Sequence, residues 1–236
     1  MSRSFNFKQF TINDHGCGMP ISTDGVLLGA WAGLPQQGHI IDIGTGSGLL
    51  ALMAAQRTQA TTITAIELDS SAAMAATANF SASPWSSRLQ CIENNITHWC
   101  QHIAPASIDS IICNPPYFNA GQQAHQQHRA TARHTDSFSH QQLLETLRYL
   151  LTTDGSASII LPAYEGQQLI NQASAYGLYC QRRCDVRTTM HKPIMRTLIE
   201  LTKNCVITEQ QQLCIHTDNT YSTDFIKLTK DFYLKM

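Results

Sequence analysis

The sequence is short of charge, and the charge that it has is balanced between the two signs. Of its 236 residues 14% are charged, and 16 Lys and Arg residues against 17 Asp and Glu residues give a net charge of −1. This balance excludes an overall basic field that would attract nucleic acid, so any nucleic-acid contact must come from a local patch. A hydrophobic content of 43% is typical of a globular domain with a sizeable core.

Long hydrophobic runs are also absent. No run approaches the ~18 apolar residues of a transmembrane helix. The first ten residues, MSRSFNFKQF, contain no apolar core of the length found in signal peptides. We therefore predict a cytoplasmic protein that does not interact with a membrane.

Paired cysteines are missing too. The eight cysteines are scattered along the chain, and none forms a CxxC pair. The nearest two, Cys180 and Cys184, have no second pair and no histidine at the spacing of a zinc site. The pattern is typical of reduced thiols in a cytosolic protein, and it predicts neither a disulfide framework nor a bound metal.

From residue 38 onward the sequence alternates between short apolar runs and helix-forming segments. Seven runs favour strands, at residues 39–44, 62–68, 88–96, 107–114, 156–162, 179–188 and 196–203. Four segments favour helices, at residues 47–57, 69–82, 139–151 and 165–177. The last two strands follow each other without a helix, so we expect them to pair antiparallel. The repeated alternation predicts the α/β class, with a mostly parallel sheet covered by helices on both faces.

Three segments lie outside this regular pattern. Residues 1–37 are rich in turns, and a helix is expected to begin at TDG, residues 23–25. Residues 118–138 form a long loop without an apolar period, and loops of that length in compact domains tend to be functional. Residues 204–236 form a C-terminal extension of strand and helix. Together with the core at 38–203, we expect one domain.

Three glycines lie between the first predicted strand and the first predicted helix, in the stretch DIGTGSG. The spacing of Gly44, Gly46 and Gly48 is GxGxG, which differs from the GxGxxG of dinucleotide-binding proteins. A turn of this kind lets the backbone approach a ligand at a helix N-terminus. The alternative is a tight strand-to-helix turn that needs glycine for its shape alone.

An acidic residue, Glu67, ends the second predicted strand. At that position a carboxylate can accept hydrogen bonds from both hydroxyls of a ribose. Asp69 is the rival for this role, but its place at the start of a helix favours an N-cap.

The fourth predicted strand ends in CNPPYF, residues 113–118. The prolines fix the backbone and keep Asn114 extended at the carboxyl end of the strand, where ligands of open α/β sheets bind. The side-chain oxygen of Asn114 and the backbone carbonyl of Pro115 can accept from the two N–H bonds of a conjugated amino group, which favours a pyramidal nitrogen whose lone pair faces an electrophile. Tyr117 can stack on a planar substrate. The alternative is a Pro-Pro turn leaving a strand.

The glycine turn, Glu67 and the Asn-Pro-Pro-Tyr motif together resemble class I S-adenosylmethionine-dependent methyltransferases that methylate amino groups, over residues 38–203. The resemblance implies a Rossmann-like three-layer sandwich, in which a seven-stranded sheet has one antiparallel strand. It implies S-adenosyl-L-methionine as cofactor, with catalytic roles for Asn114, Pro115 and Tyr117. The cofactor-binding residues that it implies are Asp42, Gly44, Gly46, Gly48, Glu67, Asn95 and Asn114. Asn95 departs from the usual aspartate, although its amide oxygen can still accept from an adenine amino group.

Three further segments make the resemblance more specific. Residues 5–32, 128–135 and 221–236 are similar to bacterial methyltransferases that modify N6 of adenosine 37 in valine tRNA. This implies a tRNA partner, and we expect the enzyme to be a monomer. It also implies that residues 1–37 cover the cofactor, with Thr23 and Asp24 contributing to its binding.

Local clusters of basic residues are compatible with an RNA partner. Between Cys180 and Arg196 there is one acid, Asp185, and five bases: Arg182, Arg183, Arg187, Lys192 and Arg196. The 118–138 loop adds Arg129 and Arg133. We expect these residues to contact phosphates, although a solvated surface would have a similar composition.

Other functions remain open at this point. Release-factor glutamine methyltransferases and ribosomal RNA guanine-N2 methyltransferases use the same motif, but 37 residues before the first core strand are too few for the helical bundle of the release-factor enzymes. A non-catalytic RNA-binding module that retains S-adenosylmethionine would not need the intact Asn-Pro-Pro-Tyr. An RNA adenine-N6 methyltransferase therefore fits the sequence best.

Overall fold

The computed structural model describes residues 3–17, 21–115, 138–218 and 220–235. Its centre is an eight-stranded sheet in the order β10-β8-β9-β7-β6-β3-β4-β5. The strands are β3 (Gln37–Ile43), β4 (Ala60–Glu67), β5 (Leu89–Glu93), β6 (Ile108–Cys113), β7 (Leu151–Pro162), β8 (Tyr179–Arg187), β9 (Ile194–Thr202) and β10 (Glu209–Cys214). All pairs are parallel except those of β9, which is antiparallel to β7 and β8. The predicted α/β class and the antiparallel pair are confirmed.

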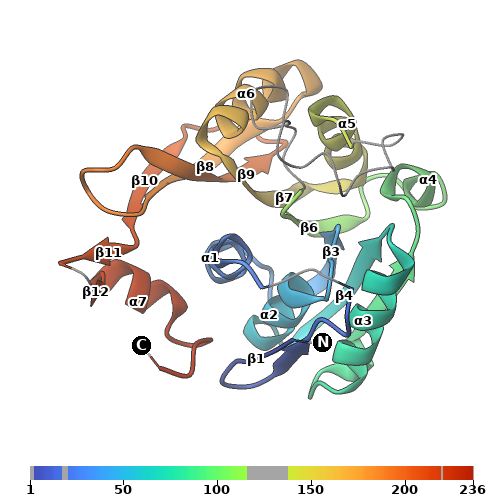
Figure 1. Cartoon of the computed structure of the whole chain (residues 1–236). Helices are drawn as coiled ribbons and strands as arrows, with labels where there is room; N and C mark the ends of the chain where they lie inside the picture. The colour runs from blue at the N-terminus through green and yellow to red at the C-terminus, as the bar shows by residue number, and fades with distance from the viewer. Residues whose placement is uncertain (1–2, 18–20, 116–137, 219, 236) are drawn as a thin grey trace, which may run out of the picture.

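Helices cover both faces of this sheet (Figure 1). They are α1 (Thr23–Trp31), α2 (Leu49–Arg57), α3 (Ser70–Ser81), α4 (Ile96–Cys100), α5 (His140–Leu150), α6 (Ala163–Ala173) and α7 (Thr223–Thr229), with short 3-10 turns at Ser86–Arg88 and Ser174–Tyr176. Side chains of α1, α2, α3 and α7 join one buried apolar cluster, and those of α4, α5 and α6 join a second. Ile40 belongs to the first cluster and its neighbour Ile41 to the second. Strands buried on both faces in this way are apolar at nearly every position.

Two features of the sheet differ from the sequence-based prediction. In the described residues the central sheet has eight strands instead of seven, because β10 adds in parallel to the edge of the sheet beside β8. Its sequence, EQQQLC, is mostly exposed, so it lacks an apolar pattern. The start of β7 was also predicted too late: it begins at Leu151, directly after α5, where Leu151 pairs with Ile108. The TTDG stretch therefore lies within a strand and forms no turn.

The segments outside the core pack against one another. β1 (Ser4–Asn6) and β2 (Thr11–Asn13) form an antiparallel hairpin, and Phe7 forms an isolated bridge with Tyr233. The rings of Phe5, Phe7, Phe10 and Tyr233 lie next to one another, with centroids 4.7 to 6.1 Å apart. After β10, a second small hairpin of β11 (His216–Thr217) and β12 (Thr220–Tyr221) leads into α7. The N-terminal hairpin and the C-terminal extension are thus in direct contact.

The core cysteines are inert side chains. All eight cysteines have free thiols, and four of them are buried. Burial raises the pKa of Cys184 to about 11 and that of Cys113 further still, so both remain protonated and unreactive. None of the helices in the described part of the chain combines the length and the apolar character that crossing a membrane requires.

Candidate active site

The glycine turn connects the end of β3 to the start of α2. Gly48 has a φ of +95°, and a Cβ added there would lie 2.6 Å from the ring of Phe80. No other residue would fit, so this glycine allows the turn to pack closely on α3. Gly44 also has a positive φ, of +69°, but a Cβ added there would meet nothing within 4 Å. The backbone of the turn at Gly44 therefore borders open space.

Asp42 lies beneath this turn, in the middle of the sheet. Its side chain is fully buried and accepts hydrogen bonds from Thr45 Oγ1 at 2.5 Å and from the Ala51 N–H at 3.1 Å, both at the same oxygen, Oδ2. Oδ1 is buried without a partner among the described residues. Burial raises the pKa of Asp42 to about 7, and the nearby charge of Glu67 adds to this rise. A buried carboxylate oxygen without a donor calls for a water molecule or a ligand group.

Glu67 is the last residue of β4 and connects that strand to the glycine turn. Its Oε2 accepts the Gly46 N–H at 2.8 Å, and its Oε1 accepts the N–H groups of Leu68 and Asp69 at 2.8 and 2.9 Å. Three backbone donors fix the carboxylate, and its remaining lone pairs can accept from hydroxyl groups. Asp69 instead caps α3, since its side chain accepts the Ala72 N–H at 3.0 Å. The structure therefore places Glu67, and not its rival, against the turn.

Asn114 follows the last residue of β6, which is the neighbour of β3. Cys113 is the Cα partner of Ile43 in the parallel register, so Asn114 and Gly44 each directly follow the last paired residue of two neighbouring strands. Asn114 is half-buried and Pro115 is buried. Pro116 and Tyr117, together with Arg129 and Arg133, lie outside the described residues. The described half of the motif thus stands beside the open space at the glycine turn.

Asn95 has a structural role that the sequence did not indicate. It is the N-cap of α4, and its Oδ1 accepts both the Thr97 N–H at 2.9 Å and the Thr97 hydroxyl at 2.7 Å. These bonds engage the same amide oxygen that was expected to accept from adenine. The cap keeps Asn95 just beyond the end of β5, the strand next to Glu67, and a contact with the adenine stays a prediction.

Thr23 and Asp24 form the first turn of α1. Their neighbour Gly25 approaches the start of α2, since a Cβ added at Gly25 would lie 2.9 Å from the side chain of Leu49. Asp24 Oδ2 accepts a hydrogen bond from Arg196 Nε at 2.7 Å. The first turn of α1 therefore lies near the glycine turn on one side and near β9 on the other.

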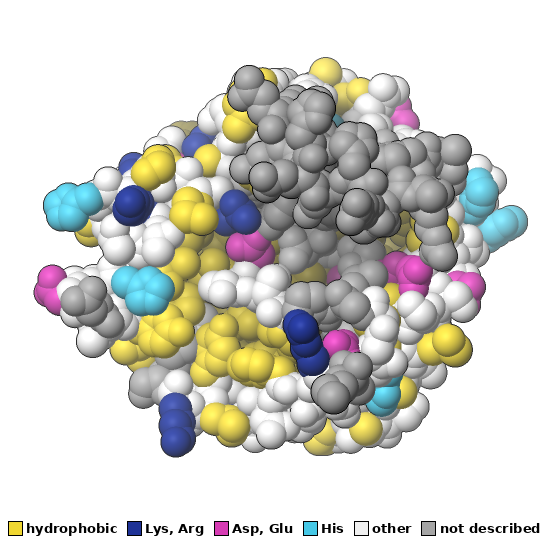
Figure 2. Space-filling model, in the orientation of Figure 1, with side chains coloured by type: hydrophobic (Ala, Val, Ile, Leu, Met, Phe, Trp, Pro, Cys, Tyr) yellow, Lys and Arg dark blue, Asp and Glu magenta, His cyan; other side chains and the backbone are white. Residues whose placement is uncertain are grey.

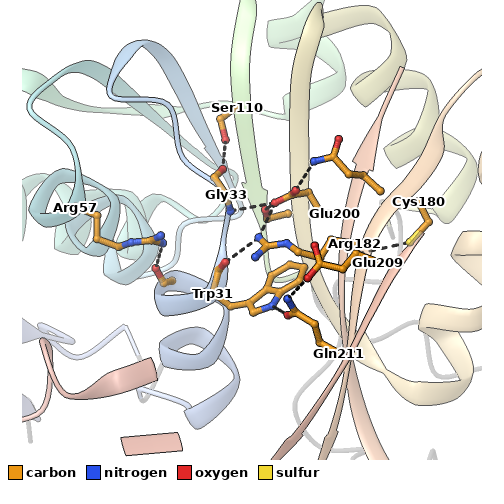
Figure 3. A network of polar contacts seen from close by, with 12 residues as sticks. Trp31, Gly33, Arg57, Ser110, Cys180, Arg182, Glu200, Glu209 and Gln211 are labelled. Carbon is orange, nitrogen blue, oxygen red and sulfur yellow. Dashed lines mark hydrogen bonds and ion pairs between the residues drawn. The ribbon is translucent and has the colours of Figure 1, made fainter. Parts of the chain in front are cut away.

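The five cations at 182–196 separate into two groups. Arg182 lies in the middle of β8, where it forms an ion pair with its β9 partner Glu200 at 2.8 Å and stacks on the Trp31 ring at 3.9 Å (Figure 3). Arg183 forms an ion pair with Asp185 at 2.9 Å. Arg187, Lys192 and Arg196 instead lie around the β8–β9 connection, at the carboxyl edge that also holds the glycine turn. The partners of Arg182 could not have been found from local sequence, because Trp31 is 151 positions away.

The described part of the chain offers no group of three or more His, Cys, Asp or Glu side chains that could hold a metal ion. The groups gathered at the carboxyl edge are instead two carboxylates, an amide and a rigid proline carbonyl, of Asp42, Glu67, Asn114 and Pro115. Such a set is suited to accept hydrogen bonds from hydroxyl and amino groups and to attract a cation.

Comparisons with known proteins agree with this geometry. The model of the methyltransferase small domain family matches residues 26–161. A relative from Photobacterium profundum, named tRNA1(Val) (adenine(37)-N6)-methyltransferase, is 58% identical and covers 100% of both chains. A relative of the same name from Vibrio vulnificus is 48% identical over 100% of this chain and 97% of its own. The solved structure of a predicted O-methyltransferase from Agrobacterium tumefaciens has a TM-score of 0.67 at 16% identity, over 89% of this chain and 96% of its own.

Proposed function

We propose a mechanism from one premise: the chain belongs to the methyltransferase small domain family and, within it, to the tRNA1(Val) (adenine(37)-N6)-methyltransferases. It is an enzyme that transfers a methyl group from S-adenosyl-L-methionine to N6 of adenosine 37 in tRNA1(Val). The observation that carries the assignment of roles is the pairing of Ile43 with Cys113, after which Gly44 and Asn114 leave neighbouring strands at the same edge.

The residues at the carboxyl edge fit the cofactor. S-adenosyl-L-methionine carries two ribose hydroxyls, an ammonium group and a sulfonium cation, and the site provides two carboxylates. Glu67 would accept from the ribose, while the buried Oδ1 of Asp42 provides a negative environment under the turn. The open space at Gly44 leaves room for a ligand against the backbone, and Gly46 and Gly48 shape the same turn.

When bound, the cofactor supplies an electrophilic methyl carbon on sulfur, which leaves as a neutral thioether. Asn114 Oδ1 and the Pro115 carbonyl would accept the two N6 hydrogens of adenine, so that the nitrogen lone pair is withdrawn from the ring and faces the methyl group. After transfer the methylated N6 would lose its extra proton to solvent, since the Asn114 amide and the Pro115 carbonyl serve only as hydrogen-bond acceptors. No strong general base is needed. Tyr117 would stack on the adenine and hold it in plane with the two acceptors.

The remaining assignments follow from position. Residues 1–37 would cover the cofactor bound to the core at 38–203, with Thr23 and Asp24 at its edge and Asn95 near the adenine. The extension at 204–236 packs on this unit through β10 and α7. Arg187, Lys192 and Arg196, with Arg129 and Arg133, would contact phosphates of the tRNA. Arg196 would do so from the carboxyl edge while paired with Asp24, whereas Arg182 and Arg183 are held in ion pairs away from this edge. We infer that the enzyme works as a monomer in the cytoplasm.

The activity is tested by mass analysis of nucleosides. Unmodified tRNA1(Val) transcript is incubated with the enzyme and methyl-labelled S-adenosyl-L-methionine, and a transcript with guanosine at position 37 is the matched control. We expect labelled N6-methyladenosine from the first transcript and none from the second. Label in guanosine, label in protein, or equal N6-methyladenosine from both transcripts would overturn the assignment.

A further inference from the structure

A second pocket lies beside the proposed catalytic site, at the same edge of the sheet. It has a volume of about 270 Å³ and lies between the first turn of α1, the β8–β9 connection and the C-terminal extension. Its lining includes Thr188, Met195, Arg196, His216, Tyr221 and Phe225. Figure 2 shows a hollow lined by hydrophobic side chains in this region, with Lys, Arg and His side chains around it.

Aromatic rings stack along one side of this pocket. The rings of His216 and Tyr221, which are Cα partners in the β11–β12 hairpin, are stacked with centroids 5.0 Å apart and an interplanar angle of 22°. Tyr221 stacks in turn on Phe225 at 4.9 Å and 22°. Phe225 is buried in the core and holds this ladder in place, whereas Tyr221 remains 47% exposed. The ladder therefore presents a fixed, partly exposed aromatic surface to the pocket.

The position of the pocket relates it to the catalytic site. Arg187, at the end of β8, is paired with Ile194 at the start of β9, and both strands meet the edge where Asn114 ends β6. Two or three strand spacings, ~10 to 15 Å, separate the pocket from Asn114 along this edge. A few nucleotides of single-stranded RNA span such a distance. Any strand that delivers a base to Asn114 thus passes close to the pocket.

The charge around the pocket favours a polyanion. Arg187 and the exposed Lys192 flank its β8–β9 side, and Arg196 lines it while paired with Asp24. Cations beside stacked rings, next to a groove, are the usual combination for binding unpaired nucleotides, in which phosphates contact the cations and bases stack on the rings. The surface of a protein partner would not need this arrangement.

We propose that this pocket binds a second nucleobase of the anticodon loop, one that flanks the target adenosine, by stacking on the His216–Tyr221–Phe225 ladder. The proposal rests on the proposed function and extends it to substrate recognition. Two bases are then held at once: the target at Asn114, and a neighbour in the pocket. Splaying two bases apart in this way is cheap in a single-stranded loop and impossible in a duplex.

The test uses the full-length enzyme and an anticodon stem-loop with the fluorescent base 2-aminopurine at each position next to the target in turn. We expect one position to be quenched on binding. Tyr221→Ala should remove that quenching and weaken RNA binding about 5- to 150-fold, as for the loss of a base-stacking ring. Tyr221→Phe, which retains the ring, should preserve both. Tyr149→Ala, an exposed tyrosine of α5 outside the pocket, is the matched control.

The outcomes separate this inference from the function on which it rests. The dissociation constant of S-adenosyl-L-methionine should be unchanged in Tyr221→Ala. Thermal melting should show a folded protein of slightly lower stability, because the stack on Phe225 is lost. If the wild-type enzyme methylates the RNA but no position shows quenching that depends on Tyr221, the pocket proposal is overturned and the activity stands. If the wild-type enzyme does not methylate the RNA, the proposed function itself fails. His216→Ala should repeat the effect of Tyr221→Ala, and an unchanged affinity there would contradict stacking on the ladder.

Discussion

Two buried acids of the central sheet have opposite surroundings. In β9, Glu200 accepts the Gly33 N–H at 3.1 Å, Gln181 Nε2 at 2.9 Å and Arg182 Nη2 at 2.8 Å (Figure 3). At the carboxyl edge, Asp42 keeps one buried oxygen without a partner among the described residues. A buried acid with satisfied oxygens stabilises the fold, whereas one left partly unsatisfied indicates a place for a ligand.

Two arginines of β8 differ in the same way in how fully their side chains are bonded within the protein. Arg182 is enclosed by Glu200 and by the Trp31 ring and carbonyl, so its charge connects α1 to β8 and β9. Arg187 is the last residue of the same strand, and among the described residues its side chain donates only to the exposed backbone carbonyl of Lys192, at 2.8 Å. Two arginines five residues apart on one strand are thus suited to different tasks, packing and RNA binding.

Of the substitutions that test this difference, removal of the Glu200 carboxylate should have the largest effect on the stability of the fold. Glu200→Ala leaves the guanidinium of Arg182 and the Gly33 N–H without their acceptor, which should lower the free energy of unfolding by about 3–5 kcal/mol. Urea denaturation measures this change, and Glu145→Ala, an exposed carboxylate on α5, is the control. Methyl transfer per folded molecule should be unaffected. A stable Glu200→Ala protein with lost activity would contradict a structural role for Glu200.

Removal of the Asn114 amide should have the opposite effect, lowering activity and leaving stability unchanged. Asn114→Ala should lower kcat by about 10²–10³-fold, as for the loss of one preorganised hydrogen-bond partner of a transition state. The free energy of unfolding and the dissociation constant of S-adenosyl-L-methionine should stay near wild type, because the amide serves the substrate. Single-turnover kinetics measure the rate of methyl transfer, titration calorimetry measures the dissociation constant of the cofactor, and urea denaturation measures the free energy of unfolding. The exposed Asn171→Ala on α6 is the control. Unchanged kcat with weakened cofactor binding would contradict the assignment.

The raised pKa of Asp42 predicts a particular dependence of stability on pH. Between about pH 4 and about pH 7 the unfolded chain has released a proton that the folded protein still holds, so wild-type stability falls as pH rises through this window. The amide in Asp42→Asn does not titrate, so the stability of this variant should not show the fall that the wild type shows over this pH range. Relative to wild type it should gain stability at about pH 8 compared with about pH 4, on the order of a few kcal/mol. Denaturation without cofactor at several pH values measures this, and parallel curves for the two proteins would contradict it.

Glu67 should matter for the cofactor more than for the fold. Glu67→Ala should weaken binding of S-adenosyl-L-methionine by ~1.5–3 kcal/mol, the value of hydrogen bonds to a charged acceptor. Glu67→Gln should have a smaller effect, since an amide oxygen can still accept from Gly46 and from a hydroxyl. Isothermal calorimetry with both variants measures the difference. A dissociation constant equal to that of wild type in Glu67→Ala would rule out the ribose contact.

The smallest effects are expected for single phosphate contacts. Arg187→Ala and Lys192→Ala should each weaken tRNA binding uniformly and reduce the slope of log K against log salt concentration by about 1. Arg183→Ala removes an equal charge from the same strand, but Arg183 is paired with Asp185, so its slope should match wild type. Filter binding over a range of salt concentrations compares the three. If the slope of log K against log salt concentration is lower for Arg183→Ala than for Arg187→Ala, the RNA contacts the group that includes Arg182 and Arg183 instead.

The sequence predicted those parts of the structure that depend on neighbouring residues. The glycine turn, Glu67 and Asn114 lie at strand ends that apolar runs and turn residues define locally, so their common edge could be anticipated. β10 could not, because a polar edge strand has no apolar period and takes its place only by pairing with β8. The different roles of Arg182 and Arg187 could not be predicted either, since they depend on the distant residues Trp31 and Glu200. Composition alone made all five cations look alike.

The bridge between Phe7 and Tyr233 has a consequence for synthesis on the ribosome. The backbone N–H of Lys8 bonds the carbonyl of Phe232 at 2.8 Å, and Phe7 packs on the ring of Tyr233. Asn13 can bond Asn79 of α3 as soon as that helix has formed, but Phe7 and Lys8 must wait for partners that are made more than 200 residues later. The two halves of this short hairpin are therefore fixed in place at different stages of synthesis.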